Sequence, residues 1–238
     1  MNRTDPGAKL GTPVHKAARC VTRTLKGVSA VDFRDLSVGG QRTDYALAWE
    51  LQRTLHAQRV ANAIGDTILL LEHPSVYTAG KRTEQWERPV DGTPVLDVDR
   101  GGKITWHGPG QLVGYPILRL PDERDVVAHV RRLESALIAT CADFSVTAIR
   151  VEGRSGVWTS DGQRKLAAIG IRVAHGVTMH GFAINADPDL AAYERIIACG
   201  ITDATVTSLS RETGQPITVA QVIASVRPHL EAELTCQV

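Results

Sequence analysis

Residues 100–116, RGGKITWHGPGQLVGYP, form the stretch around which the chain is organised. Five glycines and two prolines stand here among an arginine, a lysine, a histidine and a glutamine. Glycine has no side chain to keep another molecule away from the backbone, and Pro109 stiffens the turn. Val113 and Tyr115 then resume the alternation of a β-strand. The stretch therefore predicts a glycine-rich corner. It is either part of a plain hairpin or part of a binding surface, and the density of polar groups favours the binding surface.

The length and charge of the chain indicate how many domains it forms and which kinds of partner it lacks. Its 238 residues suit a single domain, and a hydrophobic fraction of 43% is enough for an ordinary core. The 27 basic and 26 acidic side chains leave a formal charge of +1, so we expect no nucleic-acid partner, because a dedicated binder would show a strong basic excess. No apolar run approaches the roughly 20 residues that span a bilayer, so we expect no membrane association.

The N-terminal residues 1–26 have no unbroken apolar segment of the kind found in a secretory signal. They are mildly basic and aperiodic, and we expect them to be a poorly ordered tail, with residues 27–238 forming the domain. The four cysteines, Cys20, Cys141, Cys199 and Cys236, show no metal-ligand spacing. Cysteines scattered in this way suit a reducing compartment, and we expect a cytoplasmic protein without a metal.

Strand and helix patterns alternate irregularly along the chain. Apolar or alternating runs predict strands at residues 31–36, 67–72, 95–99, 112–120, 156–159, 165–174 and 178–185. Helical periodicity predicts helices from Thr43 or Asp44 to about residue 61, over 126–143, from 190 to about 198, and from about Thr218 onward. Residues 202–215 have the composition of a loop, and Cys141 falls on the apolar side of its helix. Because no regular βαβ alternation is present, we expect an α+β or mixed α/β fold.

Two side chains stand out as candidates for chemistry. Cys199 precedes Gly200 at an element boundary and is either a small buried residue or a nucleophile that a nearby base must activate. Lys165 falls in phase with the apolar residues Ala167, Ile169 and Ile171 on one strand. It either extends to solvent at the strand end or is a partly desolvated amine that can take a proton from a thiol.

Three histidines are ambiguous: His73, His107 and His180 each flank a strand or turn. Each can act as an acid, a base or a hydrogen-bonding support.

The stretch 100–116 and five shorter segments together resemble the lipoyl (octanoyl) transferases of lipoate biosynthesis. The supporting segments follow in the family's order within residues 31–209: LEHP at 71–74, YTAG at 77–80, KLAAIG at 165–170, HGFAIN at 180–185 and ACGI at 198–201. Ala198 stands where the family often has proline. Each segment is modest alone, but the whole set is specific.

The resemblance implies the mixed α/β core shared with lipoate and biotin protein ligases, with a central mixed sheet flanked by helices. It implies transfer of an octanoyl group from octanoyl-acyl carrier protein, whose arm is phosphopantetheine, through a cysteine thioester. The implied acceptor is a lysine on a lipoyl domain of a 2-oxoacid dehydrogenase E2 subunit or of the glycine cleavage H protein. It implies no ATP and no metal. Two alternatives remain: an ATP-dependent lipoate or biotin ligase, and a non-catalytic module that binds acyl chains or lipoyl domains.

The resemblance also implies site residues. Cys199 corresponds to the family's nucleophile, and Lys165 to the lysine that lowers the pKa of that thiol. The acyl-binding positions correspond to Arg100, Gly101, Gly102, Lys103, Ile104, Thr105, Trp106, His107, Ala168, Ile169, Gly170, Gly181, Phe182 and Ala183. We count His73, Tyr77, Arg82, Gly110 and His180 as supporting residues. Because the family's carrier proteins are acidic, Lys81, Arg82, Arg131 and Arg132 are candidates for a docking patch.

Overall fold

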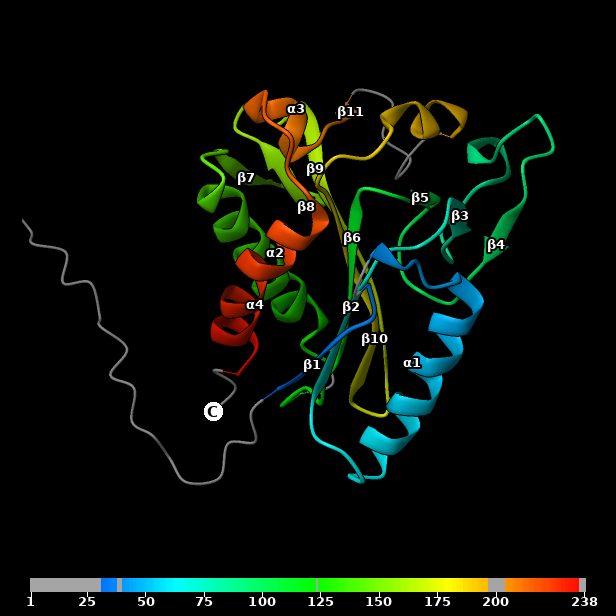
Figure 1. Ribbon diagram of the computed structural model, residues 1–238. Coiled ribbons are helices and arrows are strands. Elements are labelled where there is room, and N and C mark those ends of the chain that lie inside the picture. The colour runs from blue at the N-terminus through cyan, green and yellow to red at the C-terminus, as the bar shows by residue number, and fades with distance from the viewer. Residues whose placement is uncertain (1–30, 38–39, 123, 197–203, 236–238) are drawn as a thin grey trace, which may run out of the picture.

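The computed structural model describes residues 31–37, 40–122, 124–196 and 204–235. Its centre is an eight-stranded mixed sheet in the order β1-β2-β6-β10-β9-β8-β7, with β11 also paired to β9 (Figure 1). The strand bounds are Asp32–Asp35 for β1, Thr67–Leu71 for β2, Gln111–Ile117 for β6, Val177–Asn185 for β10, Arg164–Ala174 for β9, Arg154–Thr159 for β8, Ala148–Val151 for β7 and Thr205–Val206 for β11. The β1–β2 and β11–β9 pairs are parallel and the others antiparallel. The predicted mixed α/β fold is confirmed.

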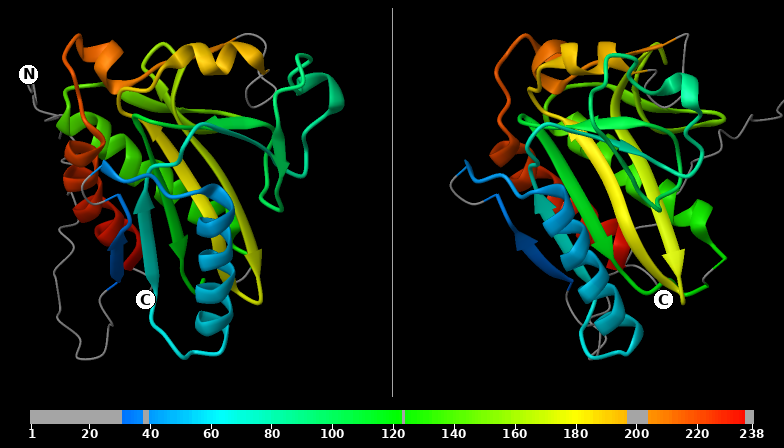
Figure 2. Two further views of the ribbon diagram at one scale, coloured as in Figure 1. Left: turned by 45° about the vertical axis from the view of Figure 1, so that its right-hand side comes forward. Right: turned by 90° about the vertical axis from the view of Figure 1, so that its right-hand side faces the viewer.

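The two faces of the central sheet are covered differently (Figures 1 and 2). Helices α2 (Val126–Asp143) and α4 (Val219–Thr235) pack together on one face. On the other face lie α1 (Tyr45–Val60) and a second sheet, in which β3 (Val76–Ala79) stands between β4 (Val95–Asp97) and β5 (Thr105–His107). The shorter helices are η2 (Gln85–Glu87), η3 (Leu190–Arg195) and α3 (Leu209–Thr213).

Strand β2 shows why both faces must be covered. All five of its residues are buried, as the continuous apolar run predicts for a strand enclosed on both sides. Ile68 and Leu70 pack into the core cluster under α2 and α4, whereas Leu69 and Leu71 pack into the cluster under α1. The alternation of side chains thus links two hydrophobic layers through one central strand.

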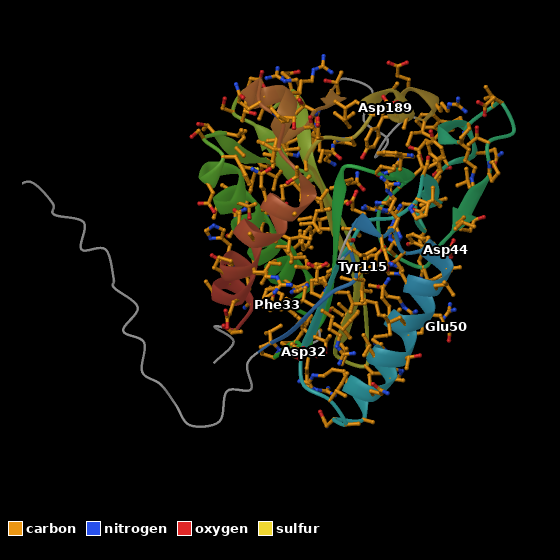
Figure 3. The ribbon with its side chains drawn as sticks, in the orientation of Figure 1. Asp32, Phe33, Asp44, Glu50, Tyr115 and Asp189 are labelled. Atoms are coloured by element: carbon orange, nitrogen blue, oxygen red, sulfur yellow. The ribbon has the colours of Figure 1, made fainter. Side chains whose placement is uncertain are left out.

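Helix α1 begins at Asp44, one of the two caps predicted from the sequence, and α2 begins after Asp125, a cap that the sequence analysis did not name. The Asp44 side chain accepts hydrogen bonds from the N–H groups of Ala46 and Leu47, and Asp125 accepts one from Ala128. Figure 3 shows Asp44 at the start of α1 and Tyr115 in the interior. Cys141 is fully buried in the core, as predicted from its helical register.

Several segments differ from the sequence prediction, including β3 and β5, which were not among the predicted strands. Residues 148–151 form β7, which was not expected, and the described part of 202–215 contains β11 and α3 instead of a loop. Strands β7 and β11 are short, and β11 pairs only with the distant strand β9, so local patterns do not reveal it. The helix expected from residue 190 is the 3₁₀ helix η3 as far as Arg195, and residues 197 and 198 lie outside the described residues. Among the described residues, no helix is long and apolar enough to cross a membrane.

Candidate active site

The side chain of Lys165 does not lie on the face predicted from strand alternation. Strands β8 and β9 pair at Val157–Ala167 and at Trp158–Lys165, which leaves Leu166 as one extra residue in β9. This irregularity is a β-bulge. Leu166 and Ala167 therefore both pack into the core cluster under α2 and α4, and Lys165 turns toward the opposite face of the sheet. The prediction that Lys165 shares a face with Ala167 is wrong because a bulge reverses the phase.

Lys165 is nonetheless buried, with 7% of its surface exposed. Its Nζ lies 4.8 Å from the ring centroid of Trp158 on the neighbouring strand, within the range of a cation–π contact. Gly156 leaves room for the lysine, because a Cβ at this position would lie 3.1 Å from Lys165 Cε and only 2.3 Å from the carbonyl oxygen of Ala167. Of the two alternatives that the sequence left open, the structure supports the buried amine.

Lys165 lies at the junction of two pockets, which share Thr105, Lys165, Ala168 and Ala183 in their walls. The smaller one, the inner pocket, has a volume of about 210 Å³. It lies between the 100–107 stretch and strands β9 and β10. Its lining includes most of the residues predicted to bind the acyl chain: Arg100, Gly102, Lys103, Thr105, His107, Ala168, Ile169, Gly170, Gly181, Phe182 and Ala183.

The remaining predicted residues support the wall of the inner pocket from behind. Ile104 and Trp106 pack with Tyr77 and Tyr193 in a separate hydrophobic cluster. This follows from the alternation of β5, which turns Thr105 and His107 toward the pocket and their neighbours away from it. The backbone N–H of Gly101 donates to the carbonyl oxygen of Ile171 at 2.8 Å. This bond ties the stretch to β9.

Two neutral histidines, each held by its own hydrogen bonds, lie beside the inner pocket with their ring centroids 5.9 Å apart. Burial lowers the pKa of His107 to about 3 and that of His73 to about 4. His107 Nδ1 donates to Gln111 Oε1 at 2.7 Å, which leaves Nε2 as an acceptor. His73 Nδ1 donates to the carbonyl oxygen of Thr43 at 2.6 Å, and its Nε2 accepts from the Tyr115 hydroxyl at 2.8 Å. This wall is polar but uncharged at neutral pH.

His180 occupies a backbone conformation that non-glycine residues rarely adopt, with φ at 58°. Its backbone N–H donates to Gln52 Oε1 at 2.8 Å, and its Nε2 donates to Asp99 Oδ1 at 2.7 Å. Burial, the largest influence, lowers the pKa of His180 against the opposing effect of Asp99. These contacts orient the imidazole at the edge of the inner pocket.

Arg100 holds the glycine-rich turn from inside. It is 7% exposed, and its guanidinium donates to the carbonyl oxygen of Lys103 at 2.8 Å and to the carbonyl oxygen and hydroxyl of Thr78 at 2.8 and 2.9 Å. The planar arrangement of its donors suits several acceptors at once. Arg100 therefore shapes the pocket wall as well as lining it.

Replacing Arg100 by lysine is expected to lower the free energy of unfolding by about 2 kcal/mol, because an ammonium cannot reach all these acceptors. Urea denaturation measures this change. Arg124→Lys, at a side chain that is 87% exposed, is the matched control and should change stability by less than about 0.5 kcal/mol. Equal stability of Arg100→Lys and wild type would mean that the turn does not depend on the guanidinium.

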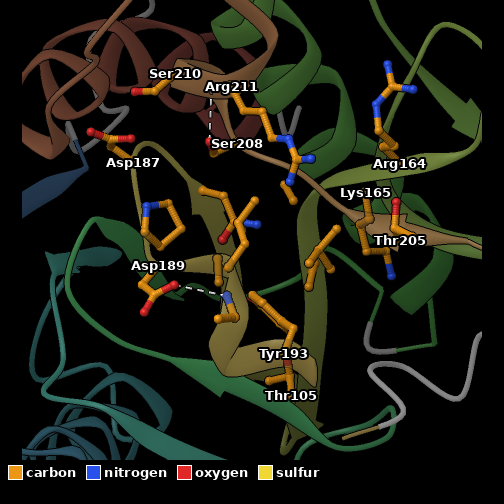
Figure 4. Close-up of a pocket in the computed structure, with 18 of the residues that line it drawn as sticks. Thr105, Arg164, Lys165, Asp187, Asp189, Tyr193, Thr205, Ser208, Ser210 and Arg211 are labelled. Carbon is orange, nitrogen blue, oxygen red and sulfur yellow. Dashed lines mark hydrogen bonds between the residues drawn. The ribbon is translucent and has the colours of Figure 1, made fainter. Parts of the chain in front are cut away.

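The larger cavity, the outer pocket, has a volume of about 1120 Å³. Figure 4 shows Arg164 and Lys165 on one side of it, with Asp187 and Asp189 on the opposite side. Cys199 itself lies outside the described residues. The nearest described residues on either side, Ile196 and Ala204, both line this pocket together with Lys165.

The supporting residues occupy different places. Tyr77 donates its hydroxyl hydrogen to the carbonyl oxygen of Ala192 at 2.7 Å, away from both pockets. The N–H of Gly110 donates to Glu72 Oε2 at 2.8 Å, and a Cβ at Gly110 would lie 2.3 Å from the carbonyl oxygen of Asp187. Arg82 lines the inner pocket.

The four basic candidates for docking do not form one patch. Lys81 and Arg82 flank the glycine-rich turn, because their N–H groups donate to the carbonyl oxygens of Arg100 and Gly102. Arg131 and Arg132 lie on α2, which covers the opposite face of the central sheet (Figure 1). The single patch expected from the sequence is therefore wrong.

Tyr45 and Trp158 are among the pocket residues that the sequence analysis did not identify. Tyr45, the first residue of α1, was not named as a site residue, but it lines the inner pocket. Trp158 lies under Lys165 because a bulge shifts the β8–β9 register at Leu166, and no local pattern reveals that shift. Within the described ranges, no group of three or more histidine, cysteine, aspartate or glutamate side chains could hold a metal ion.

Solved structures with a similar fold include lipoate ligases. A putative lipoate protein ligase from Thermoplasma acidophilum matches with a TM-score of 0.64 at 13% identity, covering 85% of each chain. A lipoate-protein ligase A bound with ATP matches with a TM-score of 0.64 at 11% identity, covering 87% of this chain and 86% of the other. At such identities the likeness shows the fold alone: a mixed α/β domain of the lipoate ligase type.

Residues 44–231 match the family described as the lipoyl protein ligase A/B catalytic domain, and the chain belongs to this family. Proteins named octanoyltransferase are much closer in sequence. The one from Salinispora arenicola is 65% identical over 191 residues, covering 79% of this chain and 90% of the relative. The one from Mycobacterium tuberculosis is 60% identical over 200 residues, covering 84% and 85%. The resemblance inferred from the sequence motifs is confirmed.

Proposed function

We propose that this chain transfers an octanoyl group to a lysine of a lipoyl domain, the first step of endogenous protein lipoylation. The observation that carries the proposal is the sequence identity of 58–65% to relatives named octanoyltransferase over most of the chain. The position of Lys165 supports it, because a buried amine lies where the inner pocket meets the outer one. We assign Cys199 as the nucleophile and Lys165 as its base.

The first step forms an acyl-enzyme. Lys165 takes the proton of the Cys199 thiol, and the thiolate attacks the carbonyl carbon of the octanoyl thioester on acyl carrier protein. The new bond from carbon to the Cys199 sulfur replaces the bond to the carrier's phosphopantetheine sulfur. The ammonium of Lys165 then protonates the departing thiolate. The chain on both sides of Cys199 borders the pocket that Lys165 lines, which supports this pairing.

The second step forms the amide. The acceptor lysine arrives as a neutral amine and attacks the thioester carbonyl, because an ammonium has no lone pair. The bond to the Cys199 sulfur breaks, and the proton lost by the nitrogen passes to Lys165 or to the thiolate. Replacing a thioester by an amide is downhill, so the proposal includes neither ATP nor a metal.

The two pockets suit different parts of the substrates. The inner pocket, at about 210 Å³, is smaller than the roughly 300–1,000 Å³ of common ligand sites. We assign it to the octanoyl chain. The outer pocket is about five times larger by the same measure (1120 against 210 Å³). We assign it in turn to the phosphopantetheine arm and to the acceptor lysine.

The protein partners follow from the same proposal. We propose octanoyl-acyl carrier protein as the donor, and lipoyl domains of 2-oxoacid dehydrogenase E2 subunits and of the glycine cleavage H protein as acceptors. Lys81 and Arg82, which are exposed beside the inner pocket, are the basic residues best placed to meet an acidic carrier. The cytoplasmic location stays a prediction.

Intact mass after mixing with octanoyl-acyl carrier protein tests the proposal directly. Without nucleotide, the protein is expected to gain one octanoyl group and to lose it again when a lipoyl domain is added. Free octanoate with ATP is the matched reaction for the ATP-dependent ligase that shares this fold, and it should give no acylated lipoyl domain. Acylation that requires ATP and free octanoate would identify a ligase. Binding of the octanoyl carrier without any covalent increment would identify a non-catalytic module.

A further inference from the structure

A buried carboxylate lies behind the lysine, on the far side of the central sheet from the two pockets. Glu134 belongs to α2, and its side chain is fully buried. Its Oε1 accepts the backbone N–H of Gly156 in β8 at 3.0 Å. Its Oε2 accepts from Arg131 Nη1 at 2.7 Å and from Arg150 Nε at 3.1 Å. Three donors therefore hold one carboxylate that faces the core.

Burying the Glu134 carboxylate costs free energy that packing alone does not explain. The neighbouring buried residues of α2 include Leu133, Leu137 and Cys141, all part of the main hydrophobic cluster. Removing an ionised carboxylate from water costs several kcal/mol, and a well-packed apolar residue often serves stability as well as an ion pair does. The group that only a hydrogen-bond acceptor can satisfy here is the N–H of Gly156. We therefore infer that Glu134 serves to hold strand β8 in place at Gly156.

Gly156 and Trp158 are the residues of β8 that contact the side chain of Lys165. Gly156 has φ at 112°, a conformation open to glycine. It leaves the space beside Lys165 Cε, since a Cβ there would lie at 3.1 Å. Two residues later, Trp158 supports Nζ with its ring at 4.8 Å. The β-bulge that turns Lys165 toward the pockets lies opposite Val157 and Trp158, directly after Gly156. A shift of β8 at Gly156 would therefore move the amine.

We propose that Glu134 is a positioning residue for Lys165. It fixes β8 at Gly156 through the sheet, so that the amine stays above Trp158 and faces the junction of the two pockets. Arg131 and Arg150 neutralise the carboxylate and hold it in this geometry. The expected effect on the reactivity of Cys199 rests on the proposed function, in which Lys165 activates this thiol. The expected effect on the position of Lys165 Nζ is independent of the proposed function.

The test compares three variants. Glu134→Ala removes the acceptor for Gly156, and Glu134→Gln keeps an amide oxygen that can accept the same N–H. Leu137→Ala destabilises the same helix face but leaves the acceptor of the Gly156 N–H in place. The rate of iodoacetamide modification of Cys199 is followed against pH, with peptide mapping to separate Cys199 from the other cysteines. Crystal structures of the wild type and of Glu134→Ala give the position of Lys165 Nζ relative to the Trp158 ring.

We expect Glu134→Ala to slow modification of Cys199 at neutral pH about tenfold and to raise the midpoint of its pH profile by about one unit. Glu134→Gln should recover most of the wild-type rate, and Leu137→Ala should keep the wild-type midpoint despite a lower melting temperature. The amine should leave the Trp158 ring in the Glu134→Ala crystal. Finding Nζ in its wild-type place there would overturn the proposal, whatever the reactivity. A displaced amine with an unchanged pH profile would uphold the positioning role and instead contradict activation of Cys199 by Lys165.

Discussion

Replacing Cys199 by alanine is expected to abolish the octanoyl increment in intact mass and to lower the transfer rate by about 10⁴-fold or more. Without the sulfur, no covalent intermediate divides the reaction into two steps. Lys165 would still lie beside both pockets, but an amine poised to deprotonate a thiol has no nucleophile to activate. The measurement is intact mass after mixing with octanoyl-acyl carrier protein, together with the rate of lipoyl-domain acylation.

Cys141→Ala is the matched control for this prediction. Cys141 is fully buried in α2, and burial raises the pKa of its thiol to about 12, so it cannot supply a thiolate at neutral pH. This variant should keep the octanoyl increment, at some loss of stability from the small cavity. Persistence of the increment in Cys199→Ala, mapped to another cysteine, would refute the nucleophile assignment.

Local sequence patterns were sufficient for the elements whose formation is decided by neighbouring residues. Helix α2 occupies 126–143, as its periodicity predicted. The run at 67–71 forms a strand buried on both faces, as a continuous apolar stretch predicts. These features need no information about the rest of the chain, because caps and periodicity act within a few residues.

The arrangement around Lys165 could not be derived in this way. The bulge at Leu166 depends on how β9 pairs with β8, and the contact of Glu134 with Gly156 joins residues 22 apart in sequence. Neither leaves a local signature. Strand alternation alone therefore predicted that the side chain of Lys165 faces the core. The structure confirms only that this lysine is buried. The motif resemblance gave the inner-pocket residues, but not their division into lining residues such as Thr105 and supporting residues such as Trp106.

Replacing Lys165 by alanine is expected to reduce the transfer rate by about 10²–10⁴-fold, the usual contribution of a general base. Iodoacetamide should also modify Cys199 more slowly at neutral pH, because less of the thiol is ionised. The variant should remain folded, since the site is close to two pockets that can admit water. The measurements are the steady-state transfer rate and the pH dependence of Cys199 modification, with far-ultraviolet circular dichroism to confirm the fold.

Lys165→Arg separates the two ways in which the amine can act. Arginine keeps a positive charge over the Trp158 ring but cannot give up its proton at any working pH, so it can stabilise a thiolate without serving as a base. If proton transfer by Lys165 is required, Lys165→Arg should retain rapid modification of Cys199 and yet lose transfer nearly as fully as Lys165→Ala. Full transfer activity in Lys165→Arg would reduce the role of the lysine to electrostatic stabilisation of the thiolate. Unchanged modification kinetics in Lys165→Ala would remove Lys165 from the activation of Cys199 altogether.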